Sequence, residues 1–119
     1  MTEVIPTFEQ ELCIRADCSE LGRVRSFAAA VAAHCGFDRR ARFRAMTAVH
    51  EAVAGQLPSV SQTRSSVSVR ALWSGGRLTF WIRSPFQLEP GLGTQLMKLC
   101  ARDVHVVPGS GGTTVRLSL

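Results

Sequence analysis

The alternation of apolar and polar residues predicts where this chain forms strands. In residues 8–16, Phe8, Leu12 and Ile14 stand at even positions among polar neighbours, a period of two that is typical of a half-buried strand. The same alternation returns in four later segments, residues 67–73, 78–82, 104–106 and 115–119. Glycine-rich segments separate the first two of these from each other and the last two from each other. The pattern therefore predicts one strand followed later by two hairpins.

Three other segments have apolar residues at the three- and four-residue steps of a helix: residues 21–35, 38–53 and 92–100. Ser19 is the expected N-cap of the first helix, Gly36 closes it, and Asp38 caps the second. The second helix is expected to bury a stripe made of Phe43, Met46, Val49, His50 and Val53. The third carries Leu92, Leu96, Leu99 and Cys100 on one side.

Two further segments lack periodicity and are expected to be irregular, residues 56–66 and 84–93. The resulting order is strand, helix, helix, strand, strand, helix, strand, strand. This order predicts an α+β two-layer sandwich, in which three helices cover one face of a mainly antiparallel mixed sheet of about five strands. With 119 residues, we expect the chain (1–119) to form a single domain.

Composition narrows the classes of protein that fit. An apolar content of 45% excludes intrinsic disorder as the main description. The four cysteines form no C-x-x-C pair, so we expect no metal site. The chain start has no basic segment followed by an apolar stretch, and no apolar run is long enough to span a bilayer, so we expect a cytoplasmic protein with reduced thiols and no membrane partner.

The net charge of +5 permits an acidic partner without naming one. Four arginines crowd the first turns of the second helix, where positive charge opposes the helix macrodipole: Arg39, Arg40, Arg42 and Arg44. They form either a solvated face or a docking patch for an acidic partner. Trp81 alternates out of phase with Phe80 and Ile82, so its indole faces outward, either as a contact surface or under a neighbouring loop.

Four stretches, in order and at matching spacing, resemble the anti-sigma-factor serine/threonine kinases (RsbW and SpoIIAB type) of the GHKL superfamily of Bergerat-fold ATPases. The resemblance covers about residues 10–119. It implies a histidine-kinase-like ATPase fold and bacterial transcription control by partner switching. The four stretches are LGRVRSF at 21–27, FRAMTAVHEAV at 43–53, GLGTQLM at 91–97 and GTTVRL at 112–117.

The resemblance assigns chemistry that this sequence only partly retains. The family's E-x-x-x-N box puts a general base and a magnesium-binding asparagine one helical turn apart. Here Glu51 matches the acid, but Gly55 replaces the asparagine, so no magnesium ligand is expected. The family's adenine-binding aspartate is replaced by Ser84, and bulky Phe86 and Leu88 follow where the family has glycines.

Three other residues match the family's nucleotide pocket. Gly91 and Gly93 correspond to its second glycine box, and Thr113 to a threonine that touches adenine. Each has a simpler explanation, because glycines form turns and threonine is common in strands. Glu51 can likewise be a surface carboxylate that balances the charge of nearby arginines.

Three functions follow for comparison. The first is a degenerate anti-sigma-type regulator that binds a sigma factor or a STAS-domain anti-anti-sigma protein, with ATP binding weak or lost, no cofactor, and a homodimer as the expected assembly. The second is an active serine/threonine kinase that phosphorylates a STAS-domain antagonist with ATP and magnesium. The sequence does not decide whether the chain has this enzymatic activity. The third, a nucleic-acid binder, rests on charge alone and is not expected, since no exposed strand interleaves aromatic and basic residues.

Overall fold

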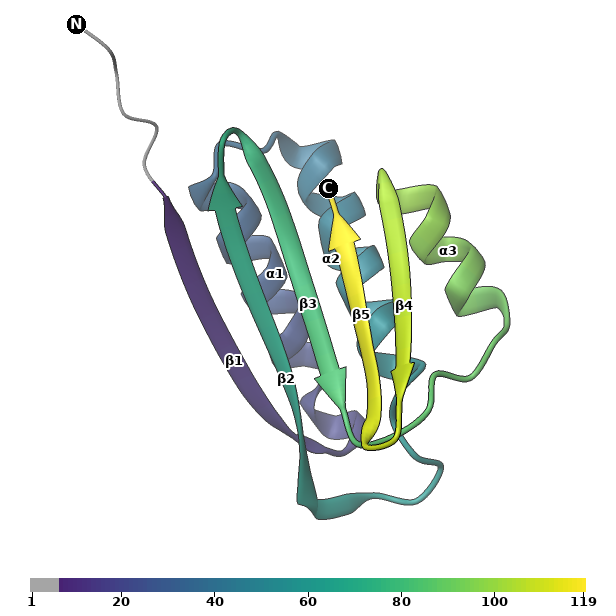
Figure 1. Ribbon diagram of the computed structural model, residues 1–119. Helices are drawn as coiled ribbons and strands as arrows, with labels where there is room; N and C mark the ends of the chain where they lie inside the picture. Colours follow the sequence, from purple (N-terminus) through teal and green to yellow (C-terminus); the bar gives the residue numbers. More distant parts are fainter. Residues whose placement is uncertain (1–6) are drawn as a thin grey trace, which may run out of the picture.

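Five strands and three α-helices form two layers in the computed structural model, which describes residues 7–119 (Figure 1). The strands pair in the order β1-β2-β3-β5-β4. The expectation that no targeting segment is present at the chain start concerns mainly residues 1–6, and these lie outside the described residues. The strands are β1 (Phe8–Ala16), β2 (Gln62–Ser74), β3 (Arg77–Ser84), β4 (Asp103–Gly109) and β5 (Gly112–Ser118), and the helices are α1 (Leu21–His34), α2 (Arg39–Ala54) and α3 (Leu92–Cys100).

The predicted α+β sandwich is confirmed, with all three helices on one face of the sheet (Figure 1). The sheet is antiparallel at every pairing among the described strands, rather than mixed as expected. Both predicted hairpins are present. The β2–β3 turn places Gly75 and Gly76 at φ +60° and +76°, the left-handed backbone that a two-residue turn requires and that glycine adopts most readily.

The core lies between the sheet and the helices, and alanines let the two layers come close together. Val67, Val69, Phe80, Ile82 and Leu117 point inward from the strands and are fully buried. The matching helix surfaces are made largely of alanine, with Ala28, Ala32, Ala45, Ala48 and Ala52 all fully buried. Small side chains on the helices complement large ones on the sheet, which is how a two-layer core reaches close packing.

The predicted cap of the second helix is confirmed and that of the first is wrong. Asp38 accepts a hydrogen bond from the amide of Ala41 at 2.8 Å at the start of α2. The N-cap residue of α1 is Glu20, not Ser19, and its side chain makes no cap hydrogen bond. The reason is a short 3₁₀ turn, Cys18–Glu20, that precedes α1 and is itself capped by Asp17, which accepts from the amide of Ser19 at 3.0 Å.

β2 begins at Gln62, inside the segment 56–66 that was expected to be irregular. Its early residues extend β2 alongside the end of β1, where the register shifts between Arg15 and Ala16. Residues 62–66 are mostly exposed and polar. A strand that is polar on both faces has no alternation to reveal it, so backbone pairing alone defines this part of β2.

The expected buried faces of α2 and α3 are partly wrong. Phe43 is 66% exposed, whereas α2 buries Ala45, Ala48, Val49, Ala52 and Val53. On α3, Met97 is fully buried while Leu92 and Leu99 are 72% and 76% exposed. The alanines of α2 turn its core-facing side away from the stripe that the larger residues suggested. No helix among the described residues is long and apolar enough to cross a membrane.

A buried carboxylate connects the end of β1 to the start of α1. The side chain of Glu20 is only 8% exposed and forms ion pairs with Arg15 at 2.9 Å and Arg23 at 2.6 Å. The hydrogen bond from Arg15 is the main reason that the pKa of Glu20 lies below its ordinary value, and Arg23 lowers it further against the opposing effect of burial. The charged form of Glu20 is thus favoured in the folded protein.

This ion-pair cluster predicts how stability depends on pH. Because folding lowers the pKa of Glu20, its contribution is present above the unfolded pKa of about 4.3 and is lost as pH falls through the folded pKa. Denaturant unfolding across pH 2–7 should therefore show an acid-side loss of stability that is smaller in Glu20→Gln. Glu89→Gln, an exposed residue in no ion pair among residues 7–119, is the matched control and should keep the wild-type profile. Equal profiles for all three proteins would contradict this role of Glu20.

Candidate functional site

The residues that match the family's nucleotide motifs lie around the carboxyl-terminal half of α2. Glu51 and Gly55 stand one turn apart on this helix, as their spacing requires. The segment from 85 to 91 leaves β3 and runs past this helix end to α3 (Figure 1). Ser84 and Thr113 are neighbours across the β3–β5 pairing. The structure thus brings these nucleotide-motif residues to one end of the sandwich, apart from the arginines of α2 and Trp81.

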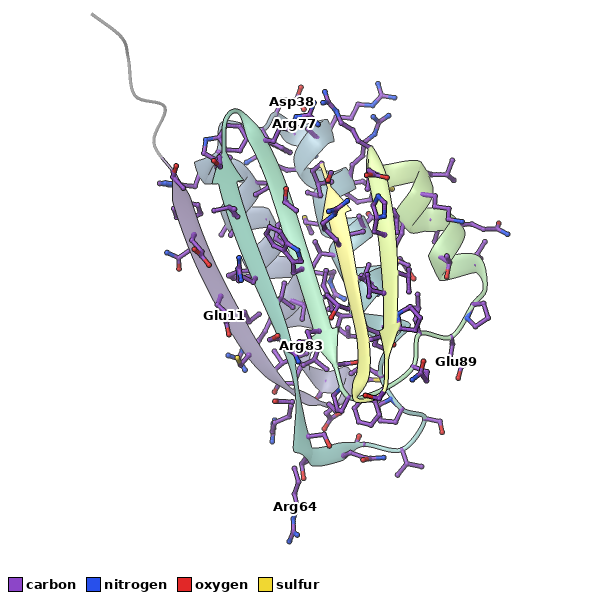
Figure 2. All side chains as sticks on the ribbon, in the orientation of Figure 1. Glu11, Asp38, Arg64, Arg77, Arg83 and Glu89 are labelled. Atoms are coloured by element: carbon purple, nitrogen blue, oxygen red, sulfur yellow. The ribbon has the colours of Figure 1, made fainter. Side chains whose placement is uncertain are left out.

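The end of α2 is covered by the chain itself. A Cβ atom on Gly55 would lie 2.7 Å from Cδ1 of Leu88, so this leucine occupies the space next to the glycine. The amide of Glu89 also donates a hydrogen bond to the carbonyl oxygen of Gly55 at 2.9 Å. Figure 2 shows Glu89 on this connecting segment, next to the helix layer. Segment 85–91 is therefore fastened to α2 through both a side chain and the backbone.

Glu51 packs against the first turn of α3. Its Oε2 atom lies 2.7 Å from where a Cβ atom on Gly93 would stand. Because Gly93 has no side chain, the carboxylate of Glu51 can approach the backbone of α3 this closely. Glu51 forms no ion pair with an arginine among residues 7–119. Gly91, by contrast, is exposed, and a Cβ atom there would meet nothing within 4 Å.

Ser84 is buried and its hydroxyl is already engaged. The hydroxyl donates to Oε1 of Gln56 at 2.6 Å and accepts from the amide of Phe86 at 3.1 Å. Gln56 is itself fully buried, and its side-chain amide donates to the carbonyl oxygen of Ala52 at 3.1 Å. A hydroxyl has a single proton, so Ser84 has no donor left for another molecule. Its bonds instead tie β3 to the end of α2.

Thr113 lies at the start of β5 and is 3% exposed. Its hydroxyl is buried and has no hydrogen-bond partner among the described residues. The preceding Gly112 has φ +133°, and a Cβ atom there would overlap the carbonyl oxygen of Ser84. Close packing of two backbones therefore accounts for Gly112, and it encloses the neighbouring threonine.

Trp81 lies on the sheet face that no helix covers, as its alternation predicts. The guanidinium of Arg70, its partner on β2, lies 4.8 Å from the centre of the indole ring, within the range of a cation–π contact. Trp81 also lines a shallow hollow with His105, Val107 and Arg116. It is half-buried by its neighbours on the sheet rather than by a loop.

The four arginines at the start of α2 line two separate hollows. Three of them line an open groove of about 660 Å³, in which Phe43 and Met46 of α2 and Ala29 of α1 supply the apolar surface. The lining arginines are Arg39, Arg40 and Arg42. Arg44 lines a second hollow, together with Leu99 of α3 and Arg102.

Sequence reasoning missed Gln56, named Leu88 only as a departure from the family's motif, and expected Phe43 to be buried. Leu88 and Gln56 fill and brace the end of α2, and Phe43 is the exposed apolar centre of the arginine-lined groove. The one available signal was the alanine content of α2. Because alanine can face the core as well as a larger residue can, the run Ala45, Ala48 and Ala52 indicates a buried face that excludes Phe43.

Comparison with known proteins relates this chain to others through its fold alone. No family model and no curated protein matches its sequence. Among solved structures, it is similar to the crystal structure of the RsbU and RsbW domains of Rv1364c from Mycobacterium tuberculosis, with a TM-score of 0.77 and 19% sequence identity. The match covers 95% of this chain and 32% of that one, so this chain spans about a third of the length of its structural neighbour. The likeness agrees with the α+β architecture predicted from the sequence.

Proposed function

We propose that this chain is an anti-sigma-type regulator that binds a protein partner, a sigma factor or a STAS-domain anti-anti-sigma protein, without using ATP. The observation that carries the proposal is the closed end of α2, where Leu88 occupies the space beside Gly55. The structural likeness to a chain containing an RsbW domain supports the choice of partner class. We therefore favour the first of the three functions that the sequence suggests.

The residues present do not fit a magnesium ion. Glu51 is the only carboxylate among the matched motif positions, and Gly55 offers no side-chain oxygen one turn away. Magnesium is usually held by one or two carboxylates together with the substrate phosphates. The carboxylate of Glu51 also lies against the backbone of Gly93. We therefore assign no catalytic step to Glu51.

The residues present do not fit adenine either. The position of the family's adenine-binding aspartate holds Ser84, which donates its one proton to Gln56. This hydroxyl is buried, already accepts from the amide of Phe86 and carries no charge, so it cannot replace the aspartate as acceptor for the adenine amino group. Loss of a hydrogen bond to a charged group costs about 1.5–3 kcal/mol, and together with the missing metal ligand this weakens nucleotide binding by about two to four orders of magnitude.

The packing of Leu88 against Gly55 predicts a non-additive pair of substitutions. Gly55 has φ −67° and ψ −15°, a backbone that suits alanine, so Gly55→Ala should stabilise the helix end unless the methyl group meets Leu88. We expect Gly55→Ala to cost about 1–3 kcal/mol in the native background and to be neutral or stabilising in Leu88→Ala. Denaturant unfolding of the four proteins in this cycle measures the difference. Additive effects would show that Leu88 does not lie on Gly55.

Calorimetry with Mg-ATP tests the proposed function directly. We expect no saturable heat below about 1 mM ATP, consistent with the loss of affinity argued above. In the same buffer, the affinity for purified sigma factors or STAS-domain proteins should be the same with and without Mg-ATP. Micromolar ATP binding, or a partner that is captured only when ATP is present, would contradict the proposal and favour the kinase.

A further inference from the structure

The groove between α1 and α2 combines features that local folding does not explain. We define the arginine groove as the surface lined by Ala29, Arg39, Arg40, Arg42, Phe43 and Met46. Cations in the first turns of a helix oppose its macrodipole, so these arginines destabilise α2 rather than support it. Phe43 is 66% exposed, so folding buries only a small part of this large apolar side chain. Both costs would be offset if a ligand covered the groove.

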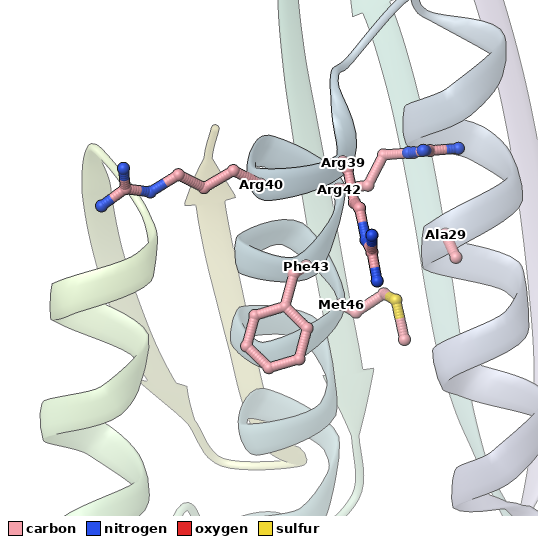
Figure 3. A pocket seen from close by; sticks show the side chains of 6 residues that line it. All are labelled: Ala29, Arg39, Arg40, Arg42, Phe43 and Met46. Atoms are coloured by element: carbon pink, nitrogen blue, oxygen red, sulfur yellow. The ribbon is translucent and has the colours of Figure 1, made fainter.

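The geometry places charge on either side of an apolar centre. Arg42 and Met46 are directed toward Ala29 of α1, whereas Arg40 extends toward α3, and the ring of Phe43 lies on the outer side of α2 between them (Figure 3). The bare hydrocarbon of Phe43, Met46 and Ala29 therefore forms the centre, with guanidinium groups at its margins.

The charge of this region is unbalanced. None of Arg39, Arg40, Arg42 or Arg44 forms an ion pair within residues 7–119. Asp38 is the acid next to them in sequence, and its carboxylate already caps α2 through the amide of Ala41. Their guanidinium groups are therefore free to pair with an acidic partner, whose carboxylates match them with paired hydrogen bonds.

We propose that the arginine groove docks an acidic amphipathic helix of the protein partner, with one apolar stripe on Phe43 and Met46 and glutamate or aspartate on both sides of it. This inference rests on the proposed function, since it names the surface that would hold the partner. An amphipathic helix supplies apolar anchors at steps of three, four and seven residues with charges beside them, which matches an apolar centre edged by arginines. Electrostatic complementarity would set its orientation and speed its association.

Two other anionic partners fit the groove less well. A bilayer surface is flat and would not reach Ala29 and Met46 inside the hollow. A nucleic acid contacts arginines mainly through its phosphates and would leave the aliphatic part of the groove without a matching surface. Both are outcomes of the test below.

The test uses a synthetic acidic helix of about 16 residues, with leucines at steps of three and four and glutamates beside them. A scrambled peptide of the same composition is its control. We expect the amphipathic peptide to bind the full chain with Kd of about 1–100 µM and to shift amide resonances of Ala29 and residues 39–46, and we expect the scrambled peptide to bind about tenfold more weakly. Binding should also weaken with rising salt.

Matched variants distinguish peptide binding in the arginine groove from attraction by the protein's overall positive charge. Arg42→Glu and Phe43→Ser should each weaken peptide binding about tenfold, measured by fluorescence anisotropy. Arg64→Glu makes the same charge reversal, and Val60→Ser likewise replaces an exposed apolar side chain with serine, at positions outside the groove; both should leave peptide binding unchanged. Figure 2 shows Arg64 at the opposite end of the molecule from Asp38, which caps α2. Since Arg42 and Phe43 lie outside the buried core, circular dichroism should show the native fold in both groove variants.

Equal binding of the two peptides, or equal losses in groove and control variants, would overturn the proposal. So would tighter binding, dependent on Arg42 and Phe43, to single-stranded RNA or to phosphatidylserine-containing vesicles than to the peptide. These results are independent of the calorimetry with Mg-ATP. Tight ATP binding would refute the proposed function and leave the groove standing, whereas failure of the peptide would remove the groove alone.

Discussion

The proposed function depends on the contact between segment 85–91 and the end of α2. Leu88 lies against Gly55, and the amide of Glu89 is bonded to the carbonyl oxygen of the same glycine. A larger residue at 55 would push the leucine away, so the glycine and the leucine depend on each other. Together they cover the end of α2 with a half-buried contact at the edge of the core.

The buried pair of Ser84 and Gln56 strengthens this closure from the sheet side. Its 2.6 Å hydrogen bond joins β3 to the residue that follows the end of α2. Buried polar groups are costly unless they are paired, so opening this region would expose two partners that now satisfy each other. Under the proposed function, the motifs that resemble a nucleotide site serve as structural joints, and the partner binds elsewhere, on the outer side of α2.

Much of the fold could be predicted from the sequence because its elements follow simple periods. The strand at 8–16 and both hairpins alternate clearly, and Asp38 precedes a helix that it caps. The start of β2 was missed because residues 62–66 are polar on both faces. The buried face of α2 was partly misplaced because alanine contributes little to a hydrophobic pattern, although it packs well against the sheet.

The site was less predictable than the fold, for a physical reason. The spacing of Glu51 and Gly55 could be read directly, since a helix fixes residues four apart on one face. The position of Leu88 could not, because an irregular segment takes its conformation from tertiary contacts rather than from local preference. The exposure of Phe43 likewise depends on how α2 turns relative to the sheet.

Hydrogen exchange at the amide of Glu89 tests the central claim most directly, because this amide is bonded to Gly55 only while segment 85–91 covers α2. The account predicts slow exchange, comparable to amides inside α2 and unchanged by Mg-ATP. Exchange at the rate of an exposed loop, or protection that changes when Mg-ATP is added, would show that this end of the molecule is open to nucleotide.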